Sequence, residues 1–221
     1  MTEKDSAEQK TFFITGGGTG GHIYPAIAVA DELCARKAKV FYVGNPKNLE
    51  FDIVKQKGYD FLPVNVHGMP RGAKLALVKW MFELGLAVLK SAGYILKYKP
   101  DAVFGTGGYV SAPALFAAKL TKTPYMLHDC DAKPGLVTRK LSAGANCVSL
   151  AFDCASKEIP NKNCLINGNP IRKTFKSLSK EEARRSLGLD DKLTLCIMGG
   201  SQGAHALNAF MLENLAEFRG G

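Results

Sequence analysis

Three glycine-rich loops, each set between a short apolar run and a helix-forming stretch, most constrain how this 221-residue chain can fold. They cover residues 16–21, 105–108 and 199–204. Each follows a run that predicts a buried strand and precedes a stretch that predicts a helix. A glycine loop in that position lets the backbone approach a ligand and points free N–H groups at an anion. The pattern therefore predicts an α/β fold with phosphate or diphosphate sites.

The rest of the chain continues this alternation of strands and helices. Strands are predicted at residues 11–15, 39–43, 61–66, 101–104, 123–127, 146–150, 164–166 and 192–198. Helices are predicted at about 24–37, 47–57, 74–97, 114–120, 135–142, 180–187 and 204–218. Strands that are separated by helices pair in parallel, so ligands are expected at the carboxyl edge of the sheet.

Breaks in the pattern divide the chain into parts. Residues 1–10 are polar and of mixed charge, and they predict a flexible tail. Residues 11–168 predict the first domain. The sequence Asn-Gly-Asn-Pro at 167–170 then interrupts the pattern. Residues 169–221 are therefore assigned to a hinge and to the first strand–helix unit of a second domain, which we expect to be truncated.

The composition favours an anionic partner. The formal charge is +9, and 46% of the residues are hydrophobic. Such a balance fits nucleic acid, an acidic lipid surface or phosphorylated substrates. Nucleic acid is disfavoured, because the basic residues flank apolar ones and no recognition motif is present. The six cysteines have no metal-ligand spacing and predict free thiols, with no metal site.

The stretch 74–97 has two interpretations. Its middle is strongly apolar and includes Trp80, Met81 and Phe82, while lysines such as Lys79 and Lys90 border it. The ordinary interpretation is a core helix packed on the sheet. The other is a helix that inserts partly into an anionic membrane surface, since it is apolar over more than one face and has a basic rim. We prefer the second, with Trp80, Met81, Phe82 and Lys79 as the contact residues.

The first glycine loop also allows more than one function. Its glycines fit the spacing Gly-x-Gly-x-x-Gly of nicotinamide-binding folds. That function needs a carboxylate at the end of the second strand, and strand 39–43 ends in Gly44-Asn45 instead. His22 follows the loop, where a histidine can transfer protons or contact a substrate hydroxyl. It could equally bond only its own loop, and this stretch leaves both roles open.

Five motifs occur in the order and approximate spacing of the MurG family: GGTGGHIYPAIA, GTGGYVSAP, HDCDAKPG, GNPIR and GGSQGA. The chain resembles these enzymes over residues 11–215. They move N-acetylglucosamine (GlcNAc) from UDP-GlcNAc to undecaprenyl-diphospho-muramoyl-pentapeptide, which converts lipid I to lipid II in peptidoglycan synthesis. The resemblance implies the GT-B architecture, with an acceptor domain followed by a donor domain, both Rossmann-like. It also implies a peripheral enzyme on the cytoplasmic face of the bacterial cell membrane, without cofactor or metal.

The resemblance implies roles for individual residues. His22 would be the general base of an inverting displacement. The acceptor diphosphate would be bound by Gly17, Gly18, Thr19, Gly20, Gly21, Gly107, Gly108 and Tyr109. UDP-GlcNAc would be bound by Thr19, Gly20, Gly21, His22, Asp131, Arg172, Ser201 and Gln202. The family usually has His-Glu-Gln-Asn where this chain has His-Asp-Cys-Asp at 128–131, so Asp131 replaces an amide.

Two other functions remain open at this point. The chain could be an inactive acceptor-binding and membrane-binding module that needs a separate donor-domain chain. It could also resemble a relative that makes glycolipid by galactosyl transfer to diacylglycerol. Nucleic-acid binding is supported by charge alone.

Overall fold

The structure is a computed structural model, and it describes residues 9–70, 72, 74–172, 178–200 and 203–219. It divides the chain into two compact units, Met1–Phe175 and Lys176–Gly221. The sequence pattern put the boundary after residue 168. In the structure, Asn169 and Arg172 belong to the first unit instead.

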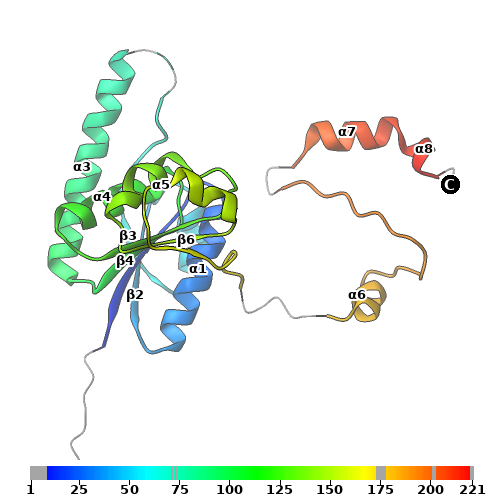
Figure 1. Ribbon diagram of the computed structural model, residues 1–221, viewed down its shortest axis with the longest axis horizontal. Helices are drawn as coiled ribbons and strands as arrows, with labels where there is room; N and C mark the ends of the chain where they lie inside the picture. The colour runs from blue at the N-terminus through cyan, green and yellow to red at the C-terminus, as the bar shows by residue number, and fades with distance from the viewer. Residues whose placement is uncertain (1–8, 71, 73, 173–177, 201–202, 220–221) are drawn as a thin grey trace, which may run out of the picture. The chain divides into compact units, whose positions relative to one another are not determined.

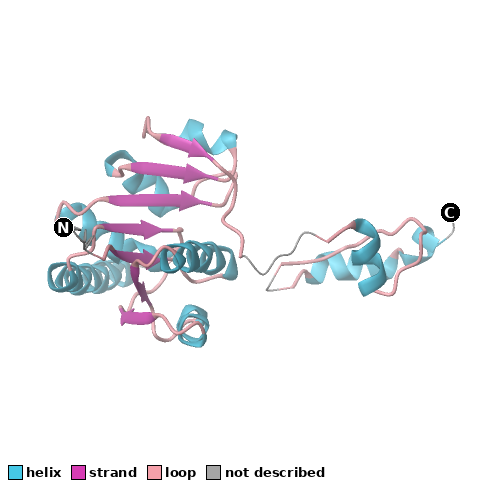
Figure 2. Cartoon of the chain, turned by 90° about the horizontal axis from the view of Figure 1, so that it is seen from below, coloured by secondary structure: helices cyan, strands magenta, loops and turns pink. Residues whose placement is uncertain are grey.

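The first unit is built on one parallel sheet, whose strands Figure 2 draws as magenta arrows. The described residues form seven strands in the order β3-β2-β1-β4-β5-β6-β7. Their bounds are β1 (Thr11–Thr15), β2 (Lys39–Gly44), β3 (Asp60–Pro63), β4 (Ala102–Gly105), β5 (Tyr125–Asp129), β6 (Cys147–Leu150) and β7 (Cys164–Ile166). Every neighbouring pair is parallel. The predicted α/β class with a Rossmann-like sheet is confirmed.

The strand order reverses between β1 and β4. The chain starts at β1, moves outward to β2 and β3, and then crosses back to pair β4 with the other side of β1. In such a sheet the loops after the two central strands diverge and leave a crevice at their carboxyl ends. The loops 16–21 and 105–108 follow these two strands. The topology therefore brings together two glycine loops that lie far apart in the sequence.

Helices cover both faces of the sheet (Figure 1). In the first unit they are α1 (Gly20–Ala35), α2 (Leu49–Gln56), α3 (Lys74–Tyr98), α4 (Ala112–Leu120) and α5 (Leu136–Leu141). Ile14 and Tyr42 pack with α1 and α2 on one face, whereas Phe13 and Phe41 pack with α3, α4 and α5 on the other. Adjacent residues of a strand point to opposite faces, so each central strand contributes to both cores.

Helix α1 begins earlier than the sequence predicted, at Gly20 rather than near residue 24. Thr19 is its N-cap and has an extended backbone. Pro25 lies inside the helix and lacks the N–H that would bond the carbonyl of Gly21. The first turn of the helix is therefore part of the glycine loop, and the free N–H groups of that turn face the sheet edge.

Helix α3 has two different halves. Its buried residues, Ala87, Ser91 and Ile95, lie one turn apart in the second half, and this helix packs on α4. The first half extends past the sheet in Figure 1 and leaves Met81 and Phe82 exposed. The interpretation as a core helix thus holds for the second half only. Within the described ranges, no helix combines the length and the apolar character needed to cross a bilayer.

In the second unit the described residues form α6 (Lys180–Ser186), α7 (His205–Glu213) and α8 (Leu215–Arg219). Ser179 and Glu182 form a capping box at the start of α6, in which each side chain bonds the backbone of the other residue. The predicted strand at 192–198 is wrong. Residues 193–198 form no regular secondary structure and pair with no strand among the described residues, and Met198 is 83% exposed. An apolar run becomes a strand only when a neighbouring strand takes up its backbone hydrogen bonds.

Candidate functional site

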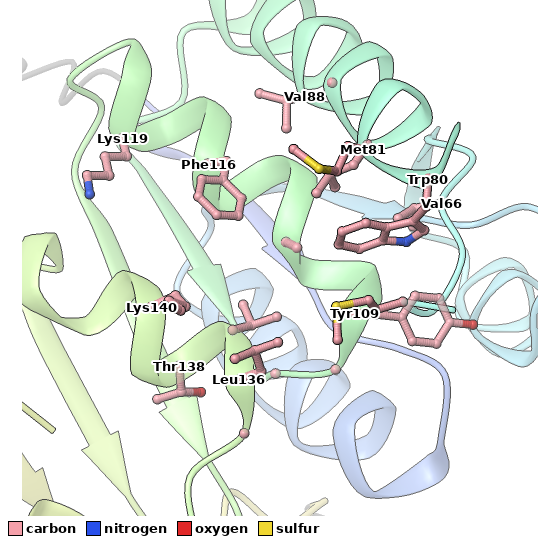
Figure 3. Close-up of a pocket in the computed structure, with 18 of the residues that line it drawn as sticks. Val66, Trp80, Met81, Val88, Tyr109, Phe116, Lys119, Leu136, Thr138 and Lys140 are labelled. Atoms are coloured by element: carbon pink, nitrogen blue, oxygen red, sulfur yellow. The ribbon is translucent and has the colours of Figure 1, made fainter. Parts of the chain in front are cut away.

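A groove of about 1360 Å³ runs from the glycine loops of the first unit to helices α3, α4 and α5. His22, Gly107, Gly108, Tyr109 and Asp131 line one end. The rest is lined mainly by apolar side chains, which include Leu77, Trp80, Met81, Leu84, Val88, Phe116 and Leu136. In Figure 3, Met81 and Val88 of α3 face Phe116 of α4 across the groove. The groove therefore has a polar, glycine-lined end and a long apolar end.

The ring of His22 is oriented by the loop that follows β4. Its Nδ1 lies 2.9 Å from the carbonyl oxygen of Thr106. A carbonyl can only accept, so Nδ1 carries the hydrogen and Nε2 keeps its lone pair. The Thr106 hydroxyl donates to the carbonyl oxygen of His22 at 2.6 Å. This arrangement leaves Nε2 as the nitrogen that can take a proton. The sequence analysis did not identify Thr106, which carries no signal besides its place in the loop.

The two glycine loops pack directly against each other. A Cβ atom added to Gly108, whose φ is +72°, would lie 2.4 Å from the carbonyl oxygen of Gly17 and 3.0 Å from Cδ2 of His22. On the other loop, the Cβ position of Gly18 lies 3.0 Å from the ring of Tyr109. The structure thus brings His22, Gly107, Gly108 and Tyr109 together beside the first glycine loop.

The segment after β5 closes the polar end of the groove. The Asp129 carboxylate accepts the N–H groups of Asp131 at 3.1 Å and Gly135 at 3.0 Å, which fixes the turn. Cys130 Sγ lies 3.8 Å from Nδ1 of His22. Burial, with the nearby charges of Asp131 and Asp129, raises the pKa of Cys130 to about 11. Cys130 is therefore a neutral thiol near pH 7, and Asp131 lines the same groove as His22.

The structure describes six of the eight residues expected to bind the nucleotide sugar. The Arg172 guanidinium lies 4.3 Å from the ring centroid of Tyr24, in α1, so a positive charge stands beside the helix that starts at the first glycine loop. Thr19 is exposed at the N-cap of that helix. Ser201 and Gln202 lie outside the described residues.

A buried polar network links β5 and β6 to the segment after β7. His128 is fully buried, with Nδ1 2.8 Å from the Ser149 hydroxyl and Nε2 2.8 Å from the Asn169 side-chain oxygen. The Ser149 hydroxyl also lies 2.7 Å from the Asn167 side-chain oxygen. The network explains why Asn169 belongs to the first unit. Sequence analysis took His128 only as part of a motif and missed this role.

Burial lowers the pKa of His128, although Asn169 and Asp129 oppose the effect and His22 adds to it. As the pH falls below 6.5, the ordinary histidine value, the unfolded chain takes up a proton that the folded chain does not. We expect the free energy of unfolding of the first unit to fall with acidification, by up to about 1.4 kcal/mol per pH unit from this residue. Urea unfolding at a series of pH values measures it.

The matched controls are the variants His128→Gln and His67→Gln. His128→Gln should remove this part of the acid slope, whereas the same change at the exposed His67 should leave the slope as it is. An acid slope that is identical in all three proteins would contradict the assignment.

Comparison with known proteins identifies the family of the first unit. Residues 12–150 match the family described as "Glycosyltransferase family 28 N-terminal domain". That range starts in β1 and ends with β6, so it contains both glycine loops and the whole groove.

Curated relatives extend the match to most of the chain. The chain is 38% identical over 211 residues to the UDP-N-acetylglucosamine–N-acetylmuramyl-(pentapeptide) pyrophosphoryl-undecaprenol N-acetylglucosamine transferase of Thermoanaerobacter sp. (strain X514). It is 39% identical over 209 residues to the protein of the same name from Halothermothrix orenii. Both matches cover 93% of this chain, but only 58% and 56% of the relatives. The chain thus spans a little over half the length of these curated relatives.

Solved structures agree with the sequence matches. The crystal structure of Acinetobacter baumannii MurG is similar with a TM-score of 0.61 at 25% identity, covering 78% of this chain and 47% of that one. A glycosyltransferase from Rickettsia africae ESF-5 has a TM-score of 0.63 at 11% identity, covering 96% and 58%, and shows the fold alone. These similarities confirm the resemblance that the five motifs predicted. The chain belongs to glycosyltransferase family 28 and carries the N-terminal domain of that family over residues 12–150.

Proposed function

We propose that this chain takes part in the transfer of GlcNAc from UDP-GlcNAc to undecaprenyl-diphospho-muramoyl-pentapeptide. The groove is the observation that carries the proposal. The acceptor consists of a sugar and a diphosphate joined to a long apolar chain. The groove presents His22 with Gly107 and Gly108 at one end and an apolar channel over the rest of its length. The relatives bear the name of this reaction.

The chemistry of the groove suggests how the acceptor binds. The N–H groups of Gly20 and Gly21, in the first turn of α1, have no intrahelical acceptor and suit a diphosphate oxygen. Gly107 and Gly108 let the opposite loop approach the same group without a side chain in the way. The apolar chain then follows the channel between Met81 and Phe116, where burial of its methylene groups contributes to binding.

The reaction is an inverting displacement. Nε2 of His22 takes the proton from the acceptor sugar hydroxyl as that oxygen bonds to the anomeric carbon of GlcNAc. The bond between the anomeric carbon and the diphosphate breaks on the opposite side, and UDP leaves with the electron pair. We assign Arg172, Ser201 and Gln202 to the diphosphate of the donor, where positive charge and N–H groups stabilise the leaving group. Asp131 is assigned to the donor sugar or ribose, whose hydroxyls can donate to a carboxylate.

The first half of α3 is the proposed contact with an anionic membrane surface, at the cytoplasmic face that the resemblance implies. Phe82 is 68% exposed and Met81 is exposed beside it. Lys79 is exposed in the same turns. Trp80 is held at the base of this surface, because its Nε1 donates to the His67 carbonyl at 2.9 Å. Exposed apolar side chains with a basic rim favour peripheral binding.

Phe82→Glu is expected to weaken binding to vesicles of phosphatidylglycerol and phosphatidylethanolamine by about tenfold, because a phenyl group loses its burial and a negative charge meets an anionic surface. Vesicle sedimentation measures the partition. The matched control is Leu187→Glu, at a site in the second unit that is 72% exposed. Equal binding by wild type, Phe82→Glu and Leu187→Glu would rule out this surface as the contact.

The reaction itself is tested by incubating the chain with radiolabelled UDP-GlcNAc and a short-chain lipid I analogue. Labelled lipid II is the expected product. The second candidate function is an acceptor-binding module that works with a separate donor-domain chain. Binding of the analogue without transfer would favour that module. If the chain neither binds the analogue nor transfers GlcNAc to it, both functions are contradicted.

A further inference from the structure

Glu50 is a fully buried acidic residue (0% exposed) that lies outside the groove. It sits in the first turn of α2, and its side chain reaches the loops that follow β1 and β2. We propose that Glu50 is a positioning residue, which holds these loops so that Tyr109 and His22 face the acceptor. This inference rests on the proposed function, because the acceptor gives the alignment its purpose.

Both oxygens of the Glu50 side chain accept backbone N–H groups. Oε2 lies 3.3 Å from the amide nitrogen of Gly18, and Oε1 lies 3.2 Å from the amide nitrogen of Asn45. A carboxylate is suited to this pattern, because both of its oxygens are acceptors and neither carries a hydrogen. One side chain thus fixes the first glycine loop relative to the end of β2.

The first connection to the site runs through the glycine loop. The Cβ position of Gly17 lies 2.7 Å from the carboxyl carbon of Glu50, so the loop backbone rests directly on this side chain. On its other side the same loop touches Gly108 and the ring of Tyr109. Gly108 in turn packs against the ring of His22. Since these contacts leave no free space, a shift at Glu50 must move the residues that line the groove.

The second connection runs through the start of α2. Asn48 is the N-cap of this helix, yet its side chain makes no capping bond and donates to the Tyr109 hydroxyl at 3.0 Å instead. Asn45, which Glu50 holds by its N–H group, also donates from its side chain to the Val66 carbonyl at 2.7 Å. Tyr109 is therefore held from two sides, and both lead back to Glu50.

The bond between Glu50 and Gly18 restricts which amides can bind the acceptor diphosphate. The Gly18 N–H group is engaged by Glu50, so it is not a donor to the acceptor diphosphate. The amides of the first turn of α1, at Gly20 and Gly21, are not bonded to Glu50 and suit the diphosphate. The proposed diphosphate site therefore omits the Gly18 amide, although the sequence had suggested all of residues 17–21.

The test is Glu50→Gln, which keeps the shape of the side chain but replaces one acceptor oxygen by an NH₂ group that faces a backbone N–H. Two donors then oppose each other in a buried place. We expect hydrogen exchange at the amide of Gly18 or Asn45 to speed up at least about tenfold. The ring resonances of Tyr109 and His22 should shift in the NMR spectrum of the full chain.

The kinetic readout separates positioning from folding. Glu50→Gln should lower kcat/KM for the lipid I analogue by about 10- to 100-fold, since small misplacements of reacting groups are costly. The KM for UDP-GlcNAc should stay within about twofold. The control is Asp52→Asn. Asp52 lies in the same helical turn as Glu50 but is exposed, so this substitution removes the same charge near the helix end without disturbing the loops.

The outcomes distinguish this inference from the proposed function. Unchanged Tyr109 and His22 resonances in folded Glu50→Gln, or shifted resonances with unchanged acceptor kinetics, would overturn the inference. If Glu50→Gln shifts these resonances but the wild-type chain neither binds nor glycosylates the acceptor, the proposed function is overturned. The inference about Glu50 then still holds. If Glu50→Gln does not fold, Asn48→Ala removes only the Tyr109 bond. That variant must then shift the Tyr109 ring resonance and weaken acceptor binding, and failure to do so overturns the inference.

Discussion

Replacing His22 by alanine is expected to lower kcat for GlcNAc transfer by about 10²- to 10⁴-fold, the usual contribution of a positioned general base. The physical reason is the orientation of the ring, because Nδ1 donates to Thr106 and only Nε2 is left to take the acceptor proton. The loss in kcat should exceed any change in the KM for UDP-GlcNAc, since the lost proton transfer occurs in the transition state. Steady-state kinetics with a short-chain lipid I analogue measures both constants.

The matched control is His67→Ala. His67 is an exposed histidine of the same unit that does not line the groove, so its loss should leave kcat within about twofold of wild type. A folded His22→Ala protein that keeps most of its kcat would show that His22 is not the base. In that case the ring would have only a structural role, which is to join the first glycine loop to the second through the Thr106 carbonyl.

The second large effect is expected from Gly108→Ala, which should lower the free energy of unfolding of the first unit by about 3 kcal/mol. Two causes combine at this residue. Its φ of +72° is costly for any residue with a Cβ atom, and that atom would lie 2.4 Å from the Gly17 carbonyl oxygen. The backbone of the first glycine loop would have to move away. Urea unfolding measures the change, and transfer activity should be lost with it.

Gly58→Ala separates these two causes. Gly58 has nearly the same φ, +76°, but an added Cβ would meet nothing within 4 Å. Its replacement should therefore cost only the conformational part, about 1 kcal/mol. The difference between the two variants combines the clash between the loops with the extra backbone strain at Gly108, whose ψ is 161°. Equal destabilisation by Gly108→Ala and Gly58→Ala would mean that the two glycine loops do not rest on each other.

Much of the site could be predicted from the sequence because it depends on backbone chemistry that is local. Glycines after an apolar strand are typical of anion-binding loops. This pattern indicated residues 17–21 and 107–108 as candidate site residues, with His22 beside them. Tyr109 came from the motif resemblance. The alternation of strands and helices gave the parallel sheet, and a parallel sheet puts such loops on one edge.

Residues that act through contacts across the fold could not be found in this way. Thr106, Glu50 and Asn48 are common residue types in unremarkable positions of the sequence. Their roles arise from hydrogen bonds to His22, Gly18 and Tyr109, which lie between 32 and 84 residues away along the chain. His128 is another such residue. Its partners Ser149 and Asn169 lie in β6 and after β7, so they contact it only when these segments have packed against β5.

The amino-acid sequence by itself determined which segments can be strands, loops and helices, since periodicity and glycine placement act over a few residues. Only the tertiary structure decided whether those preferences were realised. The apolar segment at 11–15 became a central strand because β2 and β4 take up its backbone hydrogen bonds. The equally apolar segment at 192–198 forms no strand, because a strand needs a partner and the described residues offer it none.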